Sequence, residues 1–214
     1  MRLPYAPSTP SPSAPQTAKD IYTAIAARRA PRPLQKLDLA LLHSPPVASG
    51  WNAFLGAIRS QSILPQASIQ EVAICRIAVL NRAAYEWDAH SILAVKGEDA
   101  VGAEGMRAIL EGGEFVGEEA GGRLREVKER LGKEGREGGL SARQWAVVAF
   151  ADQSTREVQV DDEVWALVKE EFSDREMVEL TATVAAYNCV SRFLAALDVG
   201  ERNGGVMEVP KEAK

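Results

Sequence analysis

Residues 68–97, SIQEVAICRIAVLNRAAYEWDAHSILAVKG, form the longest apolar-rich stretch of this 214-residue chain that contains no proline. Its aliphatic side chains surround nearly the whole circumference of a helix, and polar residues recur among them at helical spacing. We therefore expect a central helix that is buried on most sides. Covering such a helix requires other helices, so the stretch favours an all-α bundle of about eight helices with almost no strand.

Polar side chains inside this stretch need an explanation, because a charge within a buried helix is costly unless it is paired or lines a cavity. Glu71, Arg82 and Glu86 fall within one stripe of about 60°, and His90 follows Glu86 by four residues. Two interpretations stay open. Arg82 and Glu86 form an intrahelical salt bridge while Glu71 completes a capping box with Ser68, or the stripe forms a polar pocket with a His–carboxylate pair.

The N-terminal third is divided by prolines. Residues 1–17 alternate proline with serine, threonine and alanine, which predicts a disordered tail. Helices are expected over 18–29 and 37–43, the second stopped by Pro45 and Pro46, and a third from about residue 48.

Residues 97–140 contain 12 of the 17 glycines of the chain, mixed with charged residues. Two short helices are predicted there, over 104–111 and 122–131. The glycine pairs indicate turns and do not follow a strand as a phosphate-binding loop would. We expect this insertion to be a mobile excursion on the surface.

The last third again shows helical patterns, over 141–156, from about 161, and from 176 to 197, the last preceded by a Ser173–Glu176 capping box. Residues 18–202 are therefore predicted to form one domain, followed by a polar tail over 203–214. The polar members of the last helix are Tyr187, Asn188 and Arg192. They are either core or subunit-interface residues, or one or more of them reach the pocket and bind substrate.

Composition excludes several classes of partner. The net charge of -5 argues against nucleic acid and against an anionic membrane surface. No apolar run reaches the roughly 18 residues of a membrane span. Cys75 and Cys189 lie in apolar segments, which favours two buried free thiols in a reducing compartment such as the cytoplasm. A metal site made of Glu71, Glu86 and His90 is a weaker interpretation than ion pairing, so no metal or cofactor is expected.

Three phrases carry a resemblance to a known family: LLHSPPVASGWNAFLGAIR, NRAAYEWDAH and AAYNCVSRFLAAL. Together they resemble the decarboxylase branch of the carboxymuconolactone decarboxylase and alkyl hydroperoxidase D-like family. The resemblance implies an alkyl hydroperoxidase D-like helical bundle with an internal duplication, assembled as a homo-oligomer, either a trimer or a hexamer, with a dimer as the alternative.

The resemblance also implies that Glu71 and His90 share a site. In one straight helix they would lie about 28 Å apart, at 1.5 Å per residue. We therefore predict a break or sharp bend between Asn81 and Tyr85, or a site completed by a second subunit. A straight helix without such a subunit contact would remove Glu71 from the site.

The chain departs from the peroxidase branch of the family. The positions of its Cys-x-x-Cys pair hold Ala83 and Glu86 in this sequence. Thiol peroxidase chemistry needs a peroxidatic and a resolving thiol, so dithiol turnover is disfavoured. Glu71 and His90 still match, Glu86 replaces the second cysteine, and Tyr85 stands beside it.

The resemblance implies a cofactor-free lyase of the carboxymuconolactone decarboxylase type, which acts on a small carboxylated lactone or keto acid. His90 would be the general acid, with Glu71 or Glu86 setting its protonation. Arg82 or Arg192 would bind the substrate carboxylate, and Tyr85 and Asn188 are further candidates for substrate contact. The alternatives are an alkyl hydroperoxidase D-like antioxidant protein and a non-catalytic oligomeric binding protein.

Overall fold

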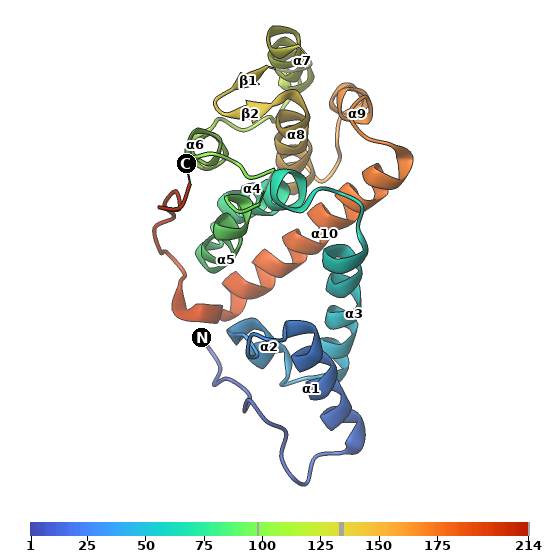
Figure 1. The fold of residues 1–214 in the computed structure, drawn as a ribbon, viewed down its shortest axis with the longest axis vertical. Helices are drawn as coiled ribbons and strands as arrows, with labels where there is room; N and C mark the ends of the chain where they lie inside the picture. The colour runs from blue at the N-terminus through green and yellow to red at the C-terminus, as the bar shows by residue number, and fades with distance from the viewer. Residues whose placement is uncertain (98, 133–134, 214) are drawn as a thin grey trace.

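The computed structural model describes residues 1–97, 99–132 and 135–213, and within them the chain folds into ten α-helices with one two-stranded sheet (Figure 1). Parts of the predictions for 97–140 and 203–214 fall on Glu98, Lys133, Glu134 and Lys214, which lie outside the described residues. The predicted all-α class is confirmed. The helices are α1 (Gln16–Arg29), α2 (Lys36–Leu41), α3 (Pro45–Gln61), α4 (Glu71–Leu80), α5 (Ala84–Ala94), α6 (Ala103–Glu111), α7 (Ala120–Leu131), α8 (Ala142–Arg156), α9 (Asp162–Lys169) and α10 (Asp174–Leu197).

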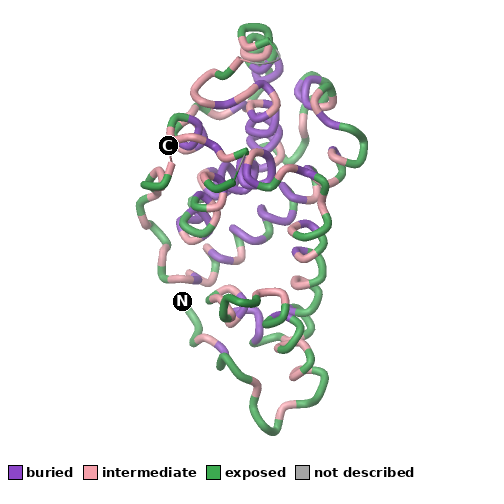
Figure 2. The backbone as a smooth tube through the Cα atoms, viewed as in Figure 1, coloured by how far each residue is buried: buried purple, intermediate pink, exposed green. Residues whose placement is uncertain are grey.

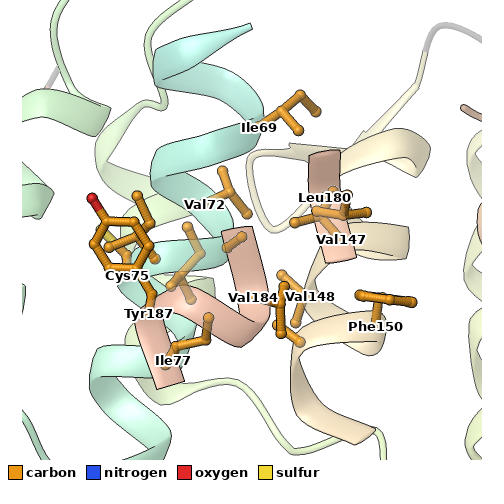
Figure 3. Packing of buried hydrophobic residues seen from close by; sticks show 14 of the residues in the cluster. Ile69, Val72, Cys75, Ile77, Val147, Val148, Phe150, Leu180, Val184 and Tyr187 are labelled. Atoms are coloured by element: carbon orange, nitrogen blue, oxygen red, sulfur yellow. The ribbon is translucent and has the colours of Figure 1, made fainter. Parts of the chain in front are cut away.

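Helix α4 occupies the centre of the bundle, in contact with α5, α6, α8 and α10. Figure 2 shows buried backbone concentrated where these helices meet. Val72 and Ile77 have no exposed surface and pack in one cluster with Val148 of α8 and Val184 of α10 (Figure 3). The predicted central burial of this stretch is confirmed.

The central stretch, residues 68–97, is broken into two helices. A break was predicted there because Glu71 and His90 cannot share a site at the two ends of one straight helix. Helix α4 ends at Leu80, and α5 begins at Ala84. Between them Arg82 has a φ of 55°, a left-handed conformation that stops an α-helix. Since α5 then packs back against α4, its residues come close to the start of α4.

Pro45 and Pro46 start a helix instead of only ending one. They occupy the first two positions of α3, where a missing backbone N–H costs nothing because those groups have no intrahelical acceptor. The predicted start near residue 48 was therefore too late.

The predicted disorder of residues 1–17 is wrong for both ends of that segment. The Arg2 backbone N–H donates to the Leu197 carbonyl at 2.8 Å, and His43 contacts the Pro4 carbonyl at 2.6 Å. Ala6 is buried against α2 and α3, and α1 already begins at Gln16. Each contact joins residues far apart in sequence, so the composition of the segment could not indicate it.

The glycine-rich insertion is packed into the bundle and is not a surface excursion. Helix α6 contacts α4, and α7 contacts α8 and α9. Met106, Ile109 and Leu124 have no exposed surface. Strands β1 (Arg136–Glu137) and β2 (Leu140–Ser141) pair antiparallel just before α8. The two predicted helices are confirmed at 103–111 and 120–131, but the mobile excursion is not.

Helix α10 follows its predicted course. Ser173 and Glu176 form the expected capping box, and Asp198 ends the helix in the left-handed conformation. The tail that follows is attached, because the Trp87 indole N–H donates to the Glu208 carbonyl at 2.9 Å.

Within the described residues, α10 is long and apolar enough to cross a membrane, and the bent pair of α3 with residues 66–80 passes the same test jointly. Half of the apolar window of α10 is buried inside the bundle, as in the core helix of a globular protein. By length and hydropathy alone, α10 thus differs from the expectation that no apolar run is long enough for a membrane span. The cytoplasmic location stays a prediction.

Candidate functional site

A cavity of about 290 Å³ lies between α1, α3, α5 and α10. His90 and Glu86 of α5 form part of its wall, as does Tyr187 of α10. Its aromatic and aliphatic surface comes from Leu37, Trp51, Leu55, Tyr85, Leu93, Val190 and Leu194. The volume suits a small organic molecule.

The break between α4 and α5 brings Glu71 to His90 within one chain. Glu71 Oε2 lies 2.7 Å from His90 Nδ1, and the Glu71 side chain has no exposed surface. The other carboxylate oxygen accepts a hydrogen bond from Arg59 of α3, which also donates to Gln70. A hydrogen bond at Nδ1 leaves Nε2 of His90 for the cavity and fixes the ring orientation. The predicted convergence is confirmed without a second subunit.

The charge of Glu71 is maintained by these two partners. Burial raises the pKa of the Glu71 carboxyl, but the combined effect of His90 and Arg59 outweighs it, and the pKa lies below its ordinary value. Glu71 is therefore an anion at neutral pH and can stabilise positive charge on the imidazole.

Glu71 does not belong to a capping box with Ser68. Residues Gln66–Gln70 form a short π-helix ahead of α4, and the Ser68 hydroxyl donates to Asp99 at 2.7 Å. The alternative of an Arg82–Glu86 salt bridge is also wrong, since Arg82 is exposed at the break and Glu86 is buried.

Glu86 faces the cavity one helical turn before His90. Its side chain is 1% exposed, and neither carboxyl oxygen has a hydrogen-bond partner among the described residues. Burial, followed by the nearby charge of Glu71, raises the pKa of this carboxyl well above its ordinary value. Both effects favour the protonated, neutral form of Glu86 beside the charged Glu71.

Four arginines line the cavity, and none of them was among the predicted site residues. Arg28, Arg29 and Arg32 come from the end of α1 and the turn after it, and Arg59 from α3. Arg29 forms two hydrogen bonds of 2.8 Å with Asp38. Arg28 lies 3.7 Å from the same carboxylate.

Only Asp38 and Glu71 therefore neutralise these four arginines among the contacts of the described residues. The excess of positive charge favours an anionic ligand. The only sequence signal for this cluster is the run of arginines at 28, 29 and 32, directly before prolines.

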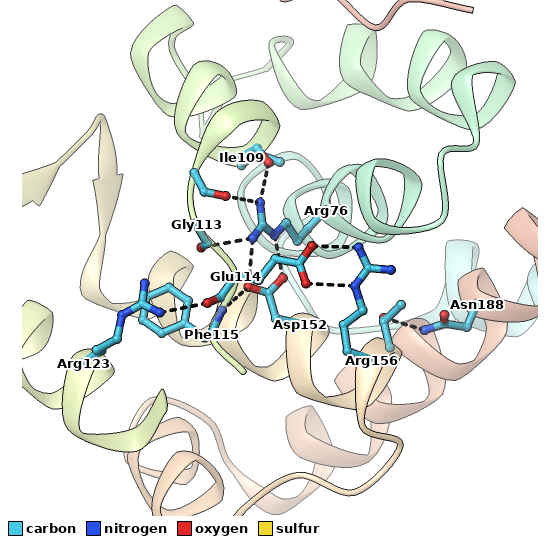
Figure 4. Close-up of polar contacts among 11 residues, drawn as sticks. Arg76, Ile109, Gly113, Glu114, Phe115, Arg123, Asp152, Arg156 and Asn188 are labelled. Carbon is cyan, nitrogen blue, oxygen red and sulfur yellow. Dashed lines mark hydrogen bonds and ion pairs between the residues drawn. The ribbon is translucent and has the colours of Figure 1, made fainter. Parts of the chain in front are cut away.

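The structure does not place all predicted substrate-binding residues at the cavity. Tyr85 lines it. Asn188 and Arg192 lie elsewhere and bind each other at 2.5 Å. Asn188 also accepts from Asn81, which ties the break between α4 and α5 to α10. Figure 4 shows Asn188 directed toward α8, where it donates to Thr155.

Tyr187 is the polar residue of α10, among those that the sequence offers for the pocket, that does line the cavity. Its ring meets the His90 ring edge-on, with 5.1 Å between centroids. Burial raises the pKa of its hydroxyl far above the ordinary value, so Tyr187 stays neutral.

Both cysteines are free. Cys75 is completely buried, and burial raises the pKa of its thiol well above the ordinary value, so it is not a thiolate at neutral pH. Cys189 is exposed, which corrects the prediction that both thiols are buried. In the part of the chain that the structure describes, no group of three His, Cys, Asp or Glu side chains is arranged to hold a metal ion.

Comparisons of the chain with models of protein families, with curated proteins and with solved structures each give no match.

Proposed function

We propose that the protein is a cofactor-free lyase that removes carbon dioxide from a small carboxylated lactone or keto acid. The observation that carries this proposal is His90, held at 2.7 Å by the buried Glu71 carboxylate in the wall of a cavity. A histidine oriented by a buried anion is suited to proton transfer near neutral pH. The sequence resemblance supports the same class of reaction.

Each part of the cavity has a role in such a reaction. Loss of carbon dioxide leaves an electron pair on the substrate, and a proton must be delivered to carbon. His90 is the group that delivers it from Nε2, while Glu71 stabilises the imidazolium from which the proton leaves. We give this role to Glu71 rather than Glu86, because Glu71 is the carboxylate that contacts the His90 ring.

In this proposal the substrate carboxylate is bound by the arginines at the end of α1 and in the turn after it. The sequence suggested Arg82 and Arg192 for that role. Arg32 is exposed at the cavity and has no ion pair within the described residues. Arg28 and Arg29 both form ion pairs with the single carboxylate of Asp38, so one of their two positive charges is not neutralised by it. Guanidinium groups bind carboxylates through paired hydrogen bonds, so these side chains are well placed to hold a substrate carboxylate.

A direct test is the release of carbon dioxide from a panel of small keto acids and carboxylated lactones by the purified protein. Catalysed release from at least one of them supports the proposal. The alternative function, an alkyl hydroperoxidase D-like antioxidant, predicts consumption of an organic hydroperoxide that disappears when Cys75 and Cys189 are both replaced by alanine. That result, without any decarboxylation, would overturn the proposal. Binding of these acids without turnover would favour the non-catalytic alternative.

Arg32→Gln is expected to raise KM for the substrate about tenfold and to leave kcat nearly unchanged. We assign Arg32 to a second substrate carboxylate, one that does not leave as carbon dioxide. Loss of Arg32 therefore weakens binding of the substrate in the ground state and in the transition state equally. Steady-state kinetics measure both constants. Arg125→Gln, an exposed arginine on α7, is the matched control and should change neither. A fall in kcat at constant KM for Arg32→Gln would contradict this assignment.

We further propose a homo-oligomer, a trimer or a hexamer. It is supported by exposed apolar side chains that α3 and α10 present on the outside of the bundle, Phe54 at 49% and Val178 at 69% exposure. Multi-angle light scattering of the purified protein should give three or six times the chain mass of 23.1 kDa. A single monomeric peak at micromolar concentration would contradict the prediction.

A further inference from the structure

The Glu86 carboxyl is a buried acid without a structural partner. Its side chain is 1% exposed, and both of its oxygens lack hydrogen bonds among the described residues. Burying a polar group without a partner is destabilising, so such a group in a folded protein calls for a reason. Because Glu86 lines the cavity, a ligand in the cavity can supply the partner that the protein does not.

The surroundings of Glu86 keep its proton in place. Glu71 and Cys75 on α4 and Tyr187 on α10 are its titratable neighbours, besides His90 on its own helix. Glu71 carries a negative charge, and Arg59, the cation nearest to that pair, is already bound to Glu71. The arginines of α1 have no ion pair with Glu86. Glu86 therefore offers an O–H donor to the cavity.

Glu86 and His90 offer two donors from one face of α5. Residues four apart on a helix have Cβ atoms about 6 Å apart. A carbonyl oxygen and the carbon next to the carbonyl can lie between two such side chains.

We propose that Glu86 donates its O–H to the substrate's carbonyl oxygen, and that the substrate is an acid with this carbonyl β to the leaving carboxylate. This inference rests on the proposed lyase function. The bond between the carboxylate carbon and the α carbon breaks, carbon dioxide leaves, and the electron pair moves onto the oxygen as an enolate. Glu86 gives its proton to that oxygen. When the His90 N–H protonates the α carbon, the oxygen returns the proton to Glu86, and His90 regains one from water.

Glu86→Gln separates proton transfer from hydrogen bonding, because the amide donates a hydrogen bond and cannot give up a proton. We expect kcat to fall about 100-fold while KM changes less than twofold. The protein should remain folded, since the two side chains have the same shape.

The stability of the same variant reports on the neutral state of Glu86 independently of any substrate. In the wild type the folded-state pKa of Glu86 is raised above the ordinary value of 4.5. Protonated Glu86 therefore stabilises the folded state relative to ionised Glu86. This stability is fully present below pH 4.5 and is lost as the pH rises through the folded-state pKa of Glu86. Glu86→Gln lacks this loss. The melting temperature of Glu86→Gln relative to the wild type should therefore increase as the pH is raised above 4.5.

A binding experiment tests the donor role without turnover. Levulinate carries a carboxylate and a ketone that is not β to it, so it does not lose carbon dioxide readily, and pentanoate has the same chain without the ketone. Calorimetry should show that the wild type binds levulinate at least fivefold more tightly than pentanoate. In Glu86→Leu, which has no donor, the two affinities should become equal.

Two outcomes would overturn the inference. One is a preference for levulinate that persists in Glu86→Leu. The other is a melting-temperature difference between Glu86→Gln and the wild type that does not change with pH. Neither measurement depends on catalysis. A protein that releases no carbon dioxide from any acid would defeat the proposed lyase function and leave both readouts intact.

Discussion

Arg76→Leu is expected to lower the free energy of unfolding by about 3–5 kcal/mol, the range for removing one partner of a buried ion pair. Arg76 is 1% exposed and Asp152 is completely buried. Their side chains form two hydrogen bonds, of 2.5 and 2.9 Å. Leucine would leave the Asp152 carboxylate without a counter-charge in the centre of the bundle, with the Phe115 backbone N–H still donating to it at 2.8 Å.

All five N–H groups of the Arg76 guanidinium are used. Besides Asp152, they donate to the carbonyls of Ile109, Gly112 and Gly113, at 2.9, 3.1 and 3.2 Å (Figure 4). The substitution therefore also removes the partner of three carbonyls at the end of α6. Urea denaturation measures the total loss. Hydrogen exchange should show faster opening of residues 103–115 than of α10.

The neighbouring pair of Arg156 and Glu114 is the matched control. It has the same charges and similar distances, of 2.7 and 2.8 Å, but its side chains are 40% and 37% exposed. Arg156→Leu should cost less than about 1 kcal/mol, as exposed ion pairs do. Equal losses for the two variants would show that burial is not what makes Arg76 important. The double variant Arg76→Leu, Asp152→Leu should recover part of the loss, since no unpaired charge remains.

The break in the central stretch shows what the sequence was able to predict. The apolar pattern alone favours one helix through Asn81 and Arg82, because neither residue forbids it. The requirement that Glu71 meet His90 predicts the interruption, which the structure confirms at Arg82. Local signals were sufficient where both partners are close in sequence, as in the capping box of Ser173 and Glu176.

The arginine cluster shows why the rest of the site was not predicted. Arg28 and Arg32 lie about 60 residues before His90 in the sequence, and no periodic pattern links them to α5. Only the packing of α1 against α3 carries them to the cavity. In the same way, Arg59 could not be recognised as the partner of Glu71, so the capping box was the simpler local explanation for that carboxylate.

The glycine-rich insertion was misjudged for a related reason. Its composition is typical of a mobile loop, but the carbonyls of Gly112 and Gly113 are bound by a guanidinium from another helix. A buried arginine with five donors can hold irregular backbone in place. The signal was Arg76 itself, a charge in an apolar run, whose role depends on residues more than 30 positions away.

His90→Ala is expected to lower kcat about 1,000-fold on whichever acid the protein decarboxylates, within the range for loss of a general acid. His90 sits at the edge of the bundle core with its side chain 17% exposed, so its removal should not unfold the protein. The melting temperature and the oligomer mass serve as controls. Unchanged turnover in this variant would end the proposal that His90 moves the proton.

Two companion measurements distinguish a catalytic His90 from a structural one. Truncation to alanine enlarges the cavity beside Tyr187, so imidazole added to the solution should restore part of the activity of His90→Ala. A structural defect would not respond to imidazole. Glu71→Gln keeps the hydrogen bond to Nδ1 but replaces an anion by a neutral amide. It should lower kcat by a larger factor than it changes KM, because the imidazolium loses the negative charge beside it. If Glu71→Gln instead changed only the stability of the protein, Glu71 would be a structural partner of Arg59 and His90 would act without it.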